Sequence, residues 1–373
     1  EVHTYISCYV HWGLWYNFAN NPGIIPAALI SLRDAYLYTG DMKYGRTGAI
    51  LVDRVADVYP DFDLMPYSGT LWNSHGGAGN GKILGRQWEC TLSKIFAQAY
   101  DAFFPAMEDP YVVDFLNAKA VQYKLDNDKS TPEKIRRNGE DGILRSIYTG
   151  CINGAIAGNF GMHQSSLATA AVVLDSLPET KEWIDWIFKR ENIQNTSNTG
   201  GGVNERLVDY VSRDGLGDES APGYNNIWLS NMIEIAEVLN GYETYPAADL
   251  YKNPKFVKMF SAIPSVMLAQ KAAPQIGDSA STAGYSLVMK FNDTLLGYQR
   301  IRDPKLAQLA YWLNRNCAEG IHGDIFTRDP EKLAADIQAV VDEYGEYDWS
   351  GSKILPEYGF AILRSGNCFK SAD

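Results

Sequence analysis

The sequence has no apolar run that approaches the roughly 20 residues of a membrane-spanning helix, so membrane insertion is not expected. It also lacks an excess of basic residues, because 33 Lys and Arg stand against 45 Asp and Glu, a formal net charge of −12. Nucleic acids are usually bound by basic faces, so they are not expected partners. Hydrophobic residues make up 46% of the 373 residues, which excludes a disordered chain and allows a sizeable core.

Cysteine is scarce, and no pair has the spacing of a metal site or a redox motif. We expect the cysteines to be mostly reduced and buried. They are Cys8, Cys90, Cys151, Cys317 and Cys368. The phosphate-binding, dinucleotide, serine-esterase and zinc-protease motifs are all missing. No signal peptide is visible, and because the chain does not begin with Met we expect that an upstream segment has been removed or left out.

The dominant feature is helical periodicity. Apolar residues recur at helical spacing in 25–36, 44–58 and 92–103, and breaks follow at Gly40, Pro60 and Pro105. Further helices are expected near residues 110–124, 133–148, 162–177, 180–190, 223–240, 253–270, 303–316 and 330–343. Helices joined by short turns predict an all-α array of helical hairpins.

Two regions depart from this pattern. Residues 191–222 are polar and Gly-rich, and a loop of that length in a helical fold is more often functional than idle. Residues 354–364 predict a turn leading into a β-strand, and a single strand needs partners. We therefore expect a second domain to begin near residue 351, with the rest of it outside this chain.

One candidate for chemistry is His163, which follows Asn159 and precedes an apolar helical face. A histidine at a helix N-terminus lies where the helix dipole attracts anions and favours the neutral imidazole. The same residue is equally well explained as a capping or core histidine, and the sequence does not decide between these roles.

A second candidate is Tyr224. Acidic residues and glycines precede Ser220, an expected N-cap, and Pro222 near the first turn, so Tyr224 is expected in the first turn of a helix. A free tyrosine titrates near 10, so a catalytic phenolate needs a cationic or donor-rich site, which Arg213 or His163 would supply. A packed tyrosine at a helix start is the structural alternative.

A Gly-rich stretch at residues 73–82 contains His75 and precedes Arg86, Gln87 and Trp88. Basic and aromatic residues beside such a loop are suited to the lining of a sugar cleft. The turn at residues 274–279 is at least as easily explained by structure as by function.

The ordered set of these segments resembles the heparinase II/III-like polysaccharide lyases. The matching stretches are AYLYTGD at 35–41, NFGMH at 159–163, DGLGDESAPGY at 214–224, GDS at 277–279 and YGFAILR at 358–364. The resemblance implies an incomplete (α/α) toroid over residues 1–350, followed at 351–373 by the first strand of a truncated antiparallel β-sandwich. It also implies β-elimination on a uronic-acid-containing polysaccharide, such as a glycosaminoglycan or alginate, and a periplasmic or extracellular bacterial protein.

The roles of residues follow from the resemblance. Tyr224 would be the acid and also the base when proton and leaving group share a face, and His163 would contact the uronate carboxylate or act as base. Asn159 would neutralise that carboxylate. The expected substrate-binding residues are Gln164, Arg213, His75, Arg86, Gln87, Trp88, Glu219 and Asn225. By the resemblance, a further histidine and any metal belong to the β domain that this chain lacks, so no metal or cofactor is expected here and we expect weak turnover from the chain alone. The missing domain is expected to pack on the toroid. The oligomeric state is left open.

Two other functions remain open. An (α/α)-barrel glycoside hydrolase would need two carboxylates across the cleft, from among Asp218, Glu219 and Asp278. A non-catalytic toroid would bind glycans without cleaving them. A polyanionic substrate fits the acidic chain only if the cleft is locally rich in donors, for which Lys82, Arg86, Arg213 and His163 are the candidates.

Overall fold

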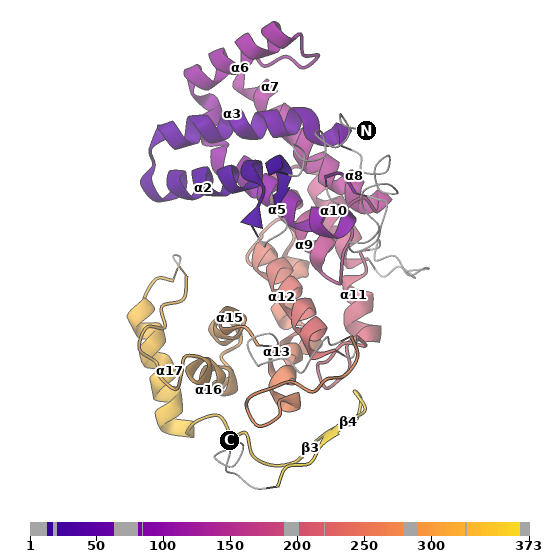
Figure 1. Ribbon diagram of the computed structural model, residues 1–373, viewed down its shortest axis with the longest axis vertical. Helices are drawn as coiled ribbons and strands as arrows, with labels where there is room; N and C mark the ends of the chain where they lie inside the picture. Colours follow the sequence, from indigo (N-terminus) through magenta and orange to yellow (C-terminus); the bar gives the residue numbers. More distant parts are fainter. Residues whose placement is uncertain are drawn as a thin grey trace. The chain divides into compact units, whose positions relative to one another are not determined.

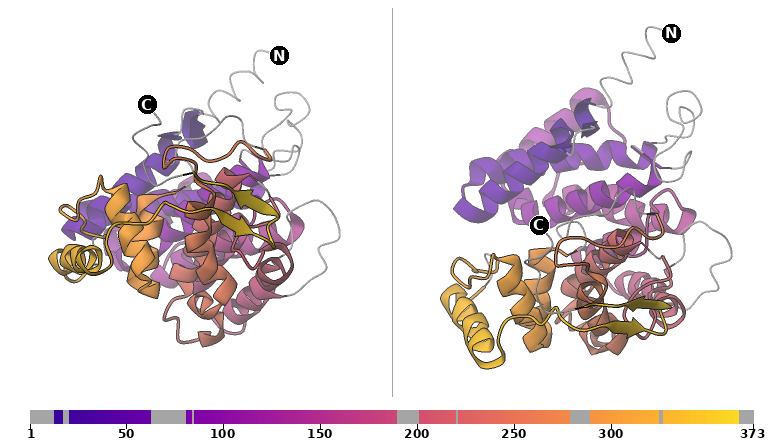
Figure 2. Two further views of the ribbon diagram at one scale, coloured as in Figure 1. Left: turned by 90° about the horizontal axis from the view of Figure 1, so that it is seen from below. Right: turned by 60° about the horizontal axis from the view of Figure 1, so that its bottom comes forward.

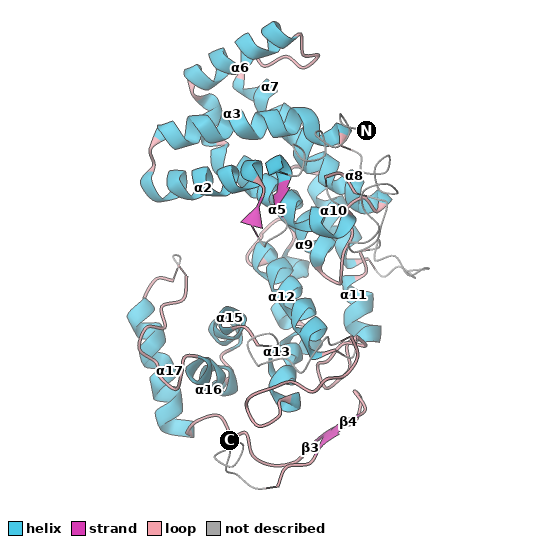
Figure 3. Ribbon diagram, in the orientation of Figure 1, coloured by secondary structure: helices cyan, strands magenta, loops and turns pink. Residues whose placement is uncertain are grey.

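The structure, a computed structural model, describes residues 13–17, 21–62, 81–83, 85–189, 201–219, 221–278, 289–324 and 327–365. The chain divides into two compact units. Unit 1 comprises Glu1–Gly202 and Tyr242–Tyr245, and unit 2 comprises Val203–Gly241 and Pro246–Asp373. The described chain is mostly helical with a few short strands (Figure 3), in agreement with an all-α fold.

Near the start of the described part of unit 1, two strands of two residues, β1 (Tyr16–Asn17) and β2 (Asn21–Pro22), pair antiparallel. The helical elements that follow are α2 (Ile24–Thr39), α3 (Met42–Val58), η1 (Tyr59–Asp61), α5 (Arg86–Phe103), η2 (Pro105–Glu108), α6 (Pro110–Tyr123), α7 (Pro132–Gly139), the π-helical η3 (Glu140–Arg145), α8 (Ser146–Asn153), α9 (Met162–Leu174) and α10 (Glu179–Phe188).

The helix ends in unit 1 follow the expected punctuation. Gly40 takes a left-handed conformation and ends α2, while the Asp41 carboxylate accepts the backbone N–H of Lys43 and caps α3. Asp109 caps α6 in the same way, and Thr131 caps α7. Each cap satisfies a backbone donor that the helix itself leaves unpaired.

The core of unit 1 forms where these helices pack. Helices α2 and α3 form a helical hairpin, and both pack on α5 (Figure 1). Helix α5 packs on α9, and α9 packs on α10. Phe96 and Phe103 of α5 are fully buried. Burial of a side chain of this size contributes about 1.5–3 kcal/mol relative to exposure.

Unit 2 contains α11 (Val203–Glu205), the π-helical η4 (Arg206–Tyr210), α12 (Pro222–Leu239), η5 (Pro246–Ala248), η6 (Leu250–Lys252), α13 (Pro254–Val266), α15 (Phe291–Ile301), α16 (Pro304–Leu313), α17 (Pro330–Tyr344), β3 (Lys353–Leu355) and β4 (Phe360–Ile362). Helix α12 packs on α13, α15 packs on α16, and α16 packs on α17. Helices α16 and α17 lie side by side in both views of Figure 2. Phe256 and Ile263 of α13 and Leu306 of α16 are among the buried residues.

The C-terminal segment differs from its prediction. It forms a hairpin in which Lys353 pairs with Ile362 and Leu355 with Phe360, so the expected strand has its partner within the chain. The turn lies between the two strands rather than before a single one. Two short strands close locally because Gly359 takes the positive φ that such a turn requires.

Several helical elements were not predicted, among them α11, η4 and α15. The expected loop at 191–222 contains α11 and η4, in which Leu207 is buried, and α15 lies in a stretch where no helix was expected. The expected helix at 253–270 ends at Val266, and the expected helix at 133–148 is three consecutive helical segments. The other expected helices are confirmed within a few residues.

The cysteines follow the prediction in part. Cys90 and Cys151 are buried and free, and burial raises the pKa of both thiols. Cys317 is free but exposed, contrary to the expectation for most of the set. Cys8 and Cys368 lie outside the described residues.

Candidate functional site

The predicted site residues fall into two groups, one in each unit. In unit 1, the beginnings of α5 and α9 lie next to each other, because the Ala157 N–H, just before α9, donates to the Arg86 carbonyl at 3.1 Å. Arg86, Gln87 and Trp88 open α5 and are half-buried. The structure thus brings these three residues to the segment that holds Asn159 and His163.

His163 is the second residue of α9, as predicted, but its side chain is only 1% exposed. The Gly158 N–H donates to its Nδ1 at 3.4 Å, so the proton of the neutral ring belongs on Nε2. The ring centroid lies 6.2 Å from that of Trp186. This is the environment of a core histidine, and contact with a substrate would require the turn before α9 to move.

Two neighbours of His163 differ from each other in accessibility. Gln164 is buried, and its side-chain amide donates to the Gly201 carbonyl at 2.8 Å, which ties α9 to the segment preceding unit 2. Asn159 is half-buried, and its backbone carbonyl accepts the Met162 N–H at 2.9 Å. Asn159 is therefore the more accessible of the two polar side chains.

In unit 2, a tight loop at residues 211–219 precedes α12. Val211 and Gly217 form an antiparallel bridge. The buried Asn225 side chain holds the loop from the first turn of α12, accepting from the Gly217 N–H and donating to the Glu219 carbonyl at 2.6 Å. Asn225 was predicted to bind substrate, but its side-chain oxygen and nitrogen already form hydrogen bonds within the loop.

Glu219 is held in place by Trp228, whose indole N–H donates to its carboxylate at 3.2 Å. Gly217 permits this arrangement, because a Cβ at that position would lie 2.5 Å from the Trp228 ring. Burial raises the pKa of the Glu219 carboxyl, and the charges of Asp218 and Asp278 raise it further against the lowering effect of the indole hydrogen bond. Glu219 is consequently easier to protonate than an ordinary glutamate.

Tyr224 is the third residue of α12, in the first turn as predicted, and is half-buried. The expected N-cap Ser220 lies outside the described residues, and the N-cap position is Ala221. Burial raises the pKa of the Tyr224 phenol, and so do the charge and hydrogen bonding of Asp278 and the charge of Glu219. The Tyr224 phenol therefore stays protonated at neutral pH.

The prediction that Arg213 is a cationic partner of Tyr224 is wrong. Its side chain is 82% exposed, and its nearest recorded acid is Glu357 in the β3–β4 turn, with the two charged groups 4.0 Å apart. The groups that perturb Tyr224 are acidic instead. Asp278, assigned mainly a turn role from the sequence, is the residue that this part of the prediction undervalued.

Asp214 has a role that no sequence signal identified. Its carboxylate accepts the backbone N–H groups of Glu357 at 2.8 Å and Tyr358 at 3.0 Å. The loop before α12 is thereby fastened to the β3–β4 hairpin, a contact between residues far apart in the sequence. Spacing along the chain carries no information on such a contact.

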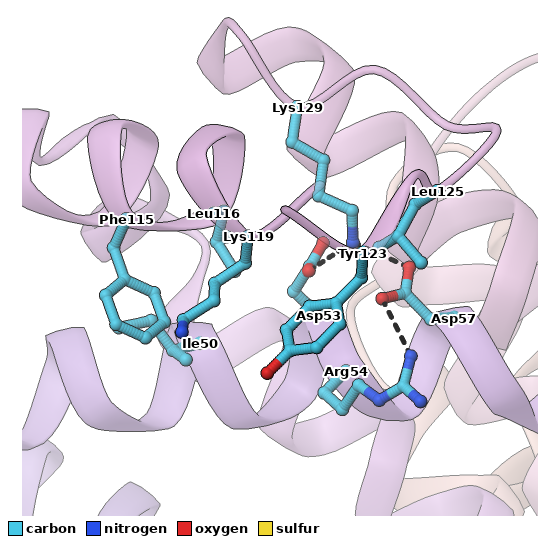
Figure 4. Close-up of a pocket in the computed structure, with 10 residues that line it drawn as sticks. All are labelled: Ile50, Asp53, Arg54, Asp57, Phe115, Leu116, Lys119, Tyr123, Leu125 and Lys129. Atoms are coloured by element: carbon cyan, nitrogen blue, oxygen red, sulfur yellow. Dashed lines mark hydrogen bonds and ion pairs between the residues drawn. The ribbon is translucent and has the colours of Figure 1, made fainter. Parts of the chain in front are cut away.

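Unit 1 also contains a cavity of about 470 Å³ between α3, α6 and the loop after α6. Figure 4 shows Lys129 reaching between Asp53 and Asp57, while side chains from α6 extend over α3. No predicted site residue lines it. The lining residues are Ile50, Asp53, Arg54, Asp57, Phe115, Leu116, Lys119, Tyr123, Leu125 and Lys129.

The charged cluster at this cavity is internally satisfied. Lys129 is 1% exposed and donates to both Asp53 and Asp57. The Asn138 amide donates to Asp53 at 2.9 Å and to Asp57 at 3.0 Å, and Asn127 donates to Asp57 at 2.8 Å. Paired charges of this kind fasten a loop to a helix, so we assign the cluster a structural role.

The remaining sequence-based assignments have these outcomes. His75 lies outside the described residues. Lys82 donates to the Pro60 carbonyl at 3.0 Å. Among the described residues, no cluster of three or more His, Cys, Asp or Glu side chains is arranged to hold a metal ion, and no helix combines the length and apolar character needed to cross a membrane.

Comparison with known proteins gives no family assignment, because no protein-family model and no curated protein sequence matches the chain.

Proposed function

We propose that the chain is the helical part of a polysaccharide lyase that cleaves a uronic-acid-containing polysaccharide by β-elimination. The observation that carries the proposal is the position of Tyr224, a half-buried phenol in the first turn of α12 that interacts with Asp278 and Glu219. A phenol that remains protonated can donate to the departing glycosidic oxygen. The proposal includes the finer architecture, an incomplete (α/α) toroid followed by a β-sandwich, and a periplasmic or extracellular location.

The first chemical requirement is neutralisation of the uronate carboxylate, because the adjacent C5 proton is not acidic while that charge remains. A hydrogen-bond donor beside the carboxylate stabilises the enolate-like intermediate. Glu219, whose pKa is raised, would act as such a donor only in its protonated form, which acid favours.

The second requirement is proton transfer. The base removes the C5 proton, the C4–O bond breaks, and the acid protonates the leaving oxygen, so no water is consumed. Tyr224 is the proposed acid.

One observation favours a glycoside hydrolase as a second candidate. Glu219 and Asp278 interact electrostatically, and the first has a raised pKa, which is the pattern of an acid beside a second carboxylate. The two reactions differ in their product, since hydrolysis consumes water and leaves a saturated sugar.

The test is a panel of uronans incubated with the protein, with the near-ultraviolet absorbance of the unsaturated uronide followed beside the release of reducing ends. The lyase proposal predicts both signals together, and their joint loss in Tyr224→Phe. Tyr344→Phe, at an exposed tyrosine of α17, is the matched control and should retain activity. Reducing ends without the unsaturated product, lost in Glu219→Gln but not in Tyr224→Phe, would establish the hydrolase instead.

A further inference from the structure

A second cavity, of about 230 Å³, lies in unit 2 where the end of α16 meets the segment after α17. These two helices pack side by side (Figure 2). The cavity is lined by Gln270, Trp312, Asn316 and residues 346–350, and we name it the tryptophan pocket. It is smaller than the roughly 300–1,000 Å³ of drug-sized sites, so it fits a single small ring.

Three aromatic rings form one wall of the tryptophan pocket. The Trp349 ring centroid lies 4.8 Å from that of Trp312 and 4.6 Å from that of Tyr347, with interplanar angles of 56° and 58°. Burial, more than the nearby charges, raises the pKa of Tyr347 to about 12. Its hydroxyl therefore remains a neutral donor and acceptor. Tilted aromatic faces of this kind offer an apolar surface to the C–H face of a sugar ring.

One of the lining residues, Trp349, carries a buried polar atom that is not satisfied. Trp349 is 6% exposed, and its indole N–H has no hydrogen-bond partner among the residues that the structure describes. An unpaired buried donor has a free-energy cost. A ligand oxygen that accepts from this N–H would remove that cost, and it reaches the N–H only after a shift of the Trp349 side chain, because the atom is fully buried.

The other lining groups select among ligands. Glu346 and Asp348 are exposed carboxylates that accept hydrogen bonds, and the Ser350 side chain and backbone lower the pKa of Asp348, which keeps it ionised. Two carboxylates repel an anionic sugar. Gln270 and Asn316 add amides that both donate and accept.

We propose that the tryptophan pocket is a binding subsite for a neutral sugar ring. Sugar hydroxyls donate to carboxylates and accept from the indole N–H, and the ring stacks on the aromatic wall. A quaternary ammonium would suit the rings and the carboxylates but would leave the Trp349 N–H unpaired. The inference goes beyond the proposed elimination reaction, because it uses none of the residues assigned to it.

The test measures binding of cellobiose, mannobiose and galactobiose to the full chain by ligand-observed NMR and tryptophan fluorescence. At least one neutral disaccharide should bind in the millimolar range, more tightly than glucuronic acid or tetramethylammonium. Trp312→Ala should weaken binding about tenfold. Tyr344→Ala, which removes an exposed aromatic ring outside the pocket, and Tyr224→Phe should leave binding unchanged.

Glu346→Gln provides a second test at an exposed position where folding is not at risk. This variant should reduce the ratio of the affinity for the neutral sugar to the affinity for glucuronic acid, because it removes one carboxylate that repels the acid. The inference is overturned if none of the three disaccharides binds, if glucuronic acid or tetramethylammonium binds more tightly, or if Trp312→Ala and Glu346→Gln both leave binding unchanged.

Discussion

Replacement of Lys129 by methionine is the sharpest test of how unit 1 is held together. The ammonium group is 1% exposed and lies between Asp53 and Asp57, which are 2% and 8% exposed. Burial raises the pKa of Asp53 even with the ammonium beside it. Burial alone would also raise the pKa of Asp57, but hydrogen bonds from Lys129 and Asn127 outweigh it and lower that pKa.

The magnitude follows from what the variant leaves behind. Removal of one partner from a buried ion pair costs about 3–5 kcal/mol, because the remaining charge is buried without compensation. Methionine fills most of the space of lysine, and the amides of Asn127 and Asn138 still donate to the carboxylates, so the lower limit applies. We expect a loss of about 3 kcal/mol in the stability of this region.

Hydrogen exchange of peptides from α3 and from residues 125–131 measures this loss. A decrease of about 3 kcal/mol corresponds to protection factors lower by roughly two orders of magnitude. Lys134→Met is the matched control, since Lys134 pairs with Asp128 in the same segment but both side chains are about half exposed. Exposed pairs contribute little, so this control should change protection only slightly.

The pH dependence separates the buried charges from a packing effect. Without the ammonium, the folded-state pKa values of Asp53 and Asp57 should lie above their unfolded values. Stability contributed by such groups is present below the unfolded pKa and is lost as pH rises through the folded pKa. The deficit of Lys129→Met should therefore shrink in acid. Equal, small changes in Lys129→Met and Lys134→Met would refute this reasoning, as would a deficit that does not depend on pH.

Three further predictions concern the loop before α12. Gly217→Ala should destabilise unit 2 by about 1–3 kcal/mol, because the new methyl group meets the Trp228 ring, and should alter the near-ultraviolet circular dichroism of that tryptophan. Asp214→Ala should weaken attachment of the β3–β4 hairpin by about 1 kcal/mol, seen as faster exchange in residues 353–362 with α13 unchanged. Glu219→Gln should raise stability at neutral pH and have no effect below pH 4, because the wild-type carboxyl has a raised folded-state pKa and loses stability as pH rises through it; a gain that persists in acid would contradict this sign.

The helices were largely predictable because their apolar spacing and their caps are local signals. Helix α15 was missed because Gly297 in its middle lowers the helical propensity. In the structure that glycine allows close packing, since a Cβ there would lie 2.5 Å from the Phe260 ring of α13. Propensity was therefore overruled by a contact that the sequence does not display.

The positions of two candidate residues on their helices were predictable, but their environments were not. The sequence placed Tyr224 and His163 correctly in the first turns of their helices. It could not show that one ring is half-buried beside two carboxylates while the other is enclosed in the core. Both environments come from residues distant in the chain, such as Asp278 for the tyrosine and Trp186 for the histidine.

The acidic surroundings of Tyr224 give a prediction about ionic strength. If a uronan approaches the loop before α12, it meets Asp218, Glu219 and Asp278, whereas a donor-rich cleft was expected from the sequence. Repulsion between exposed charges is screened within about 10 Å at 0.1 M salt. KM for the uronan should therefore fall as salt is raised from a few millimolar to that range, with kcat little changed. A KM that rises with salt would mean that basic groups dominate the approach to Tyr224, and the acidic segment would then have to face away from the bound polysaccharide.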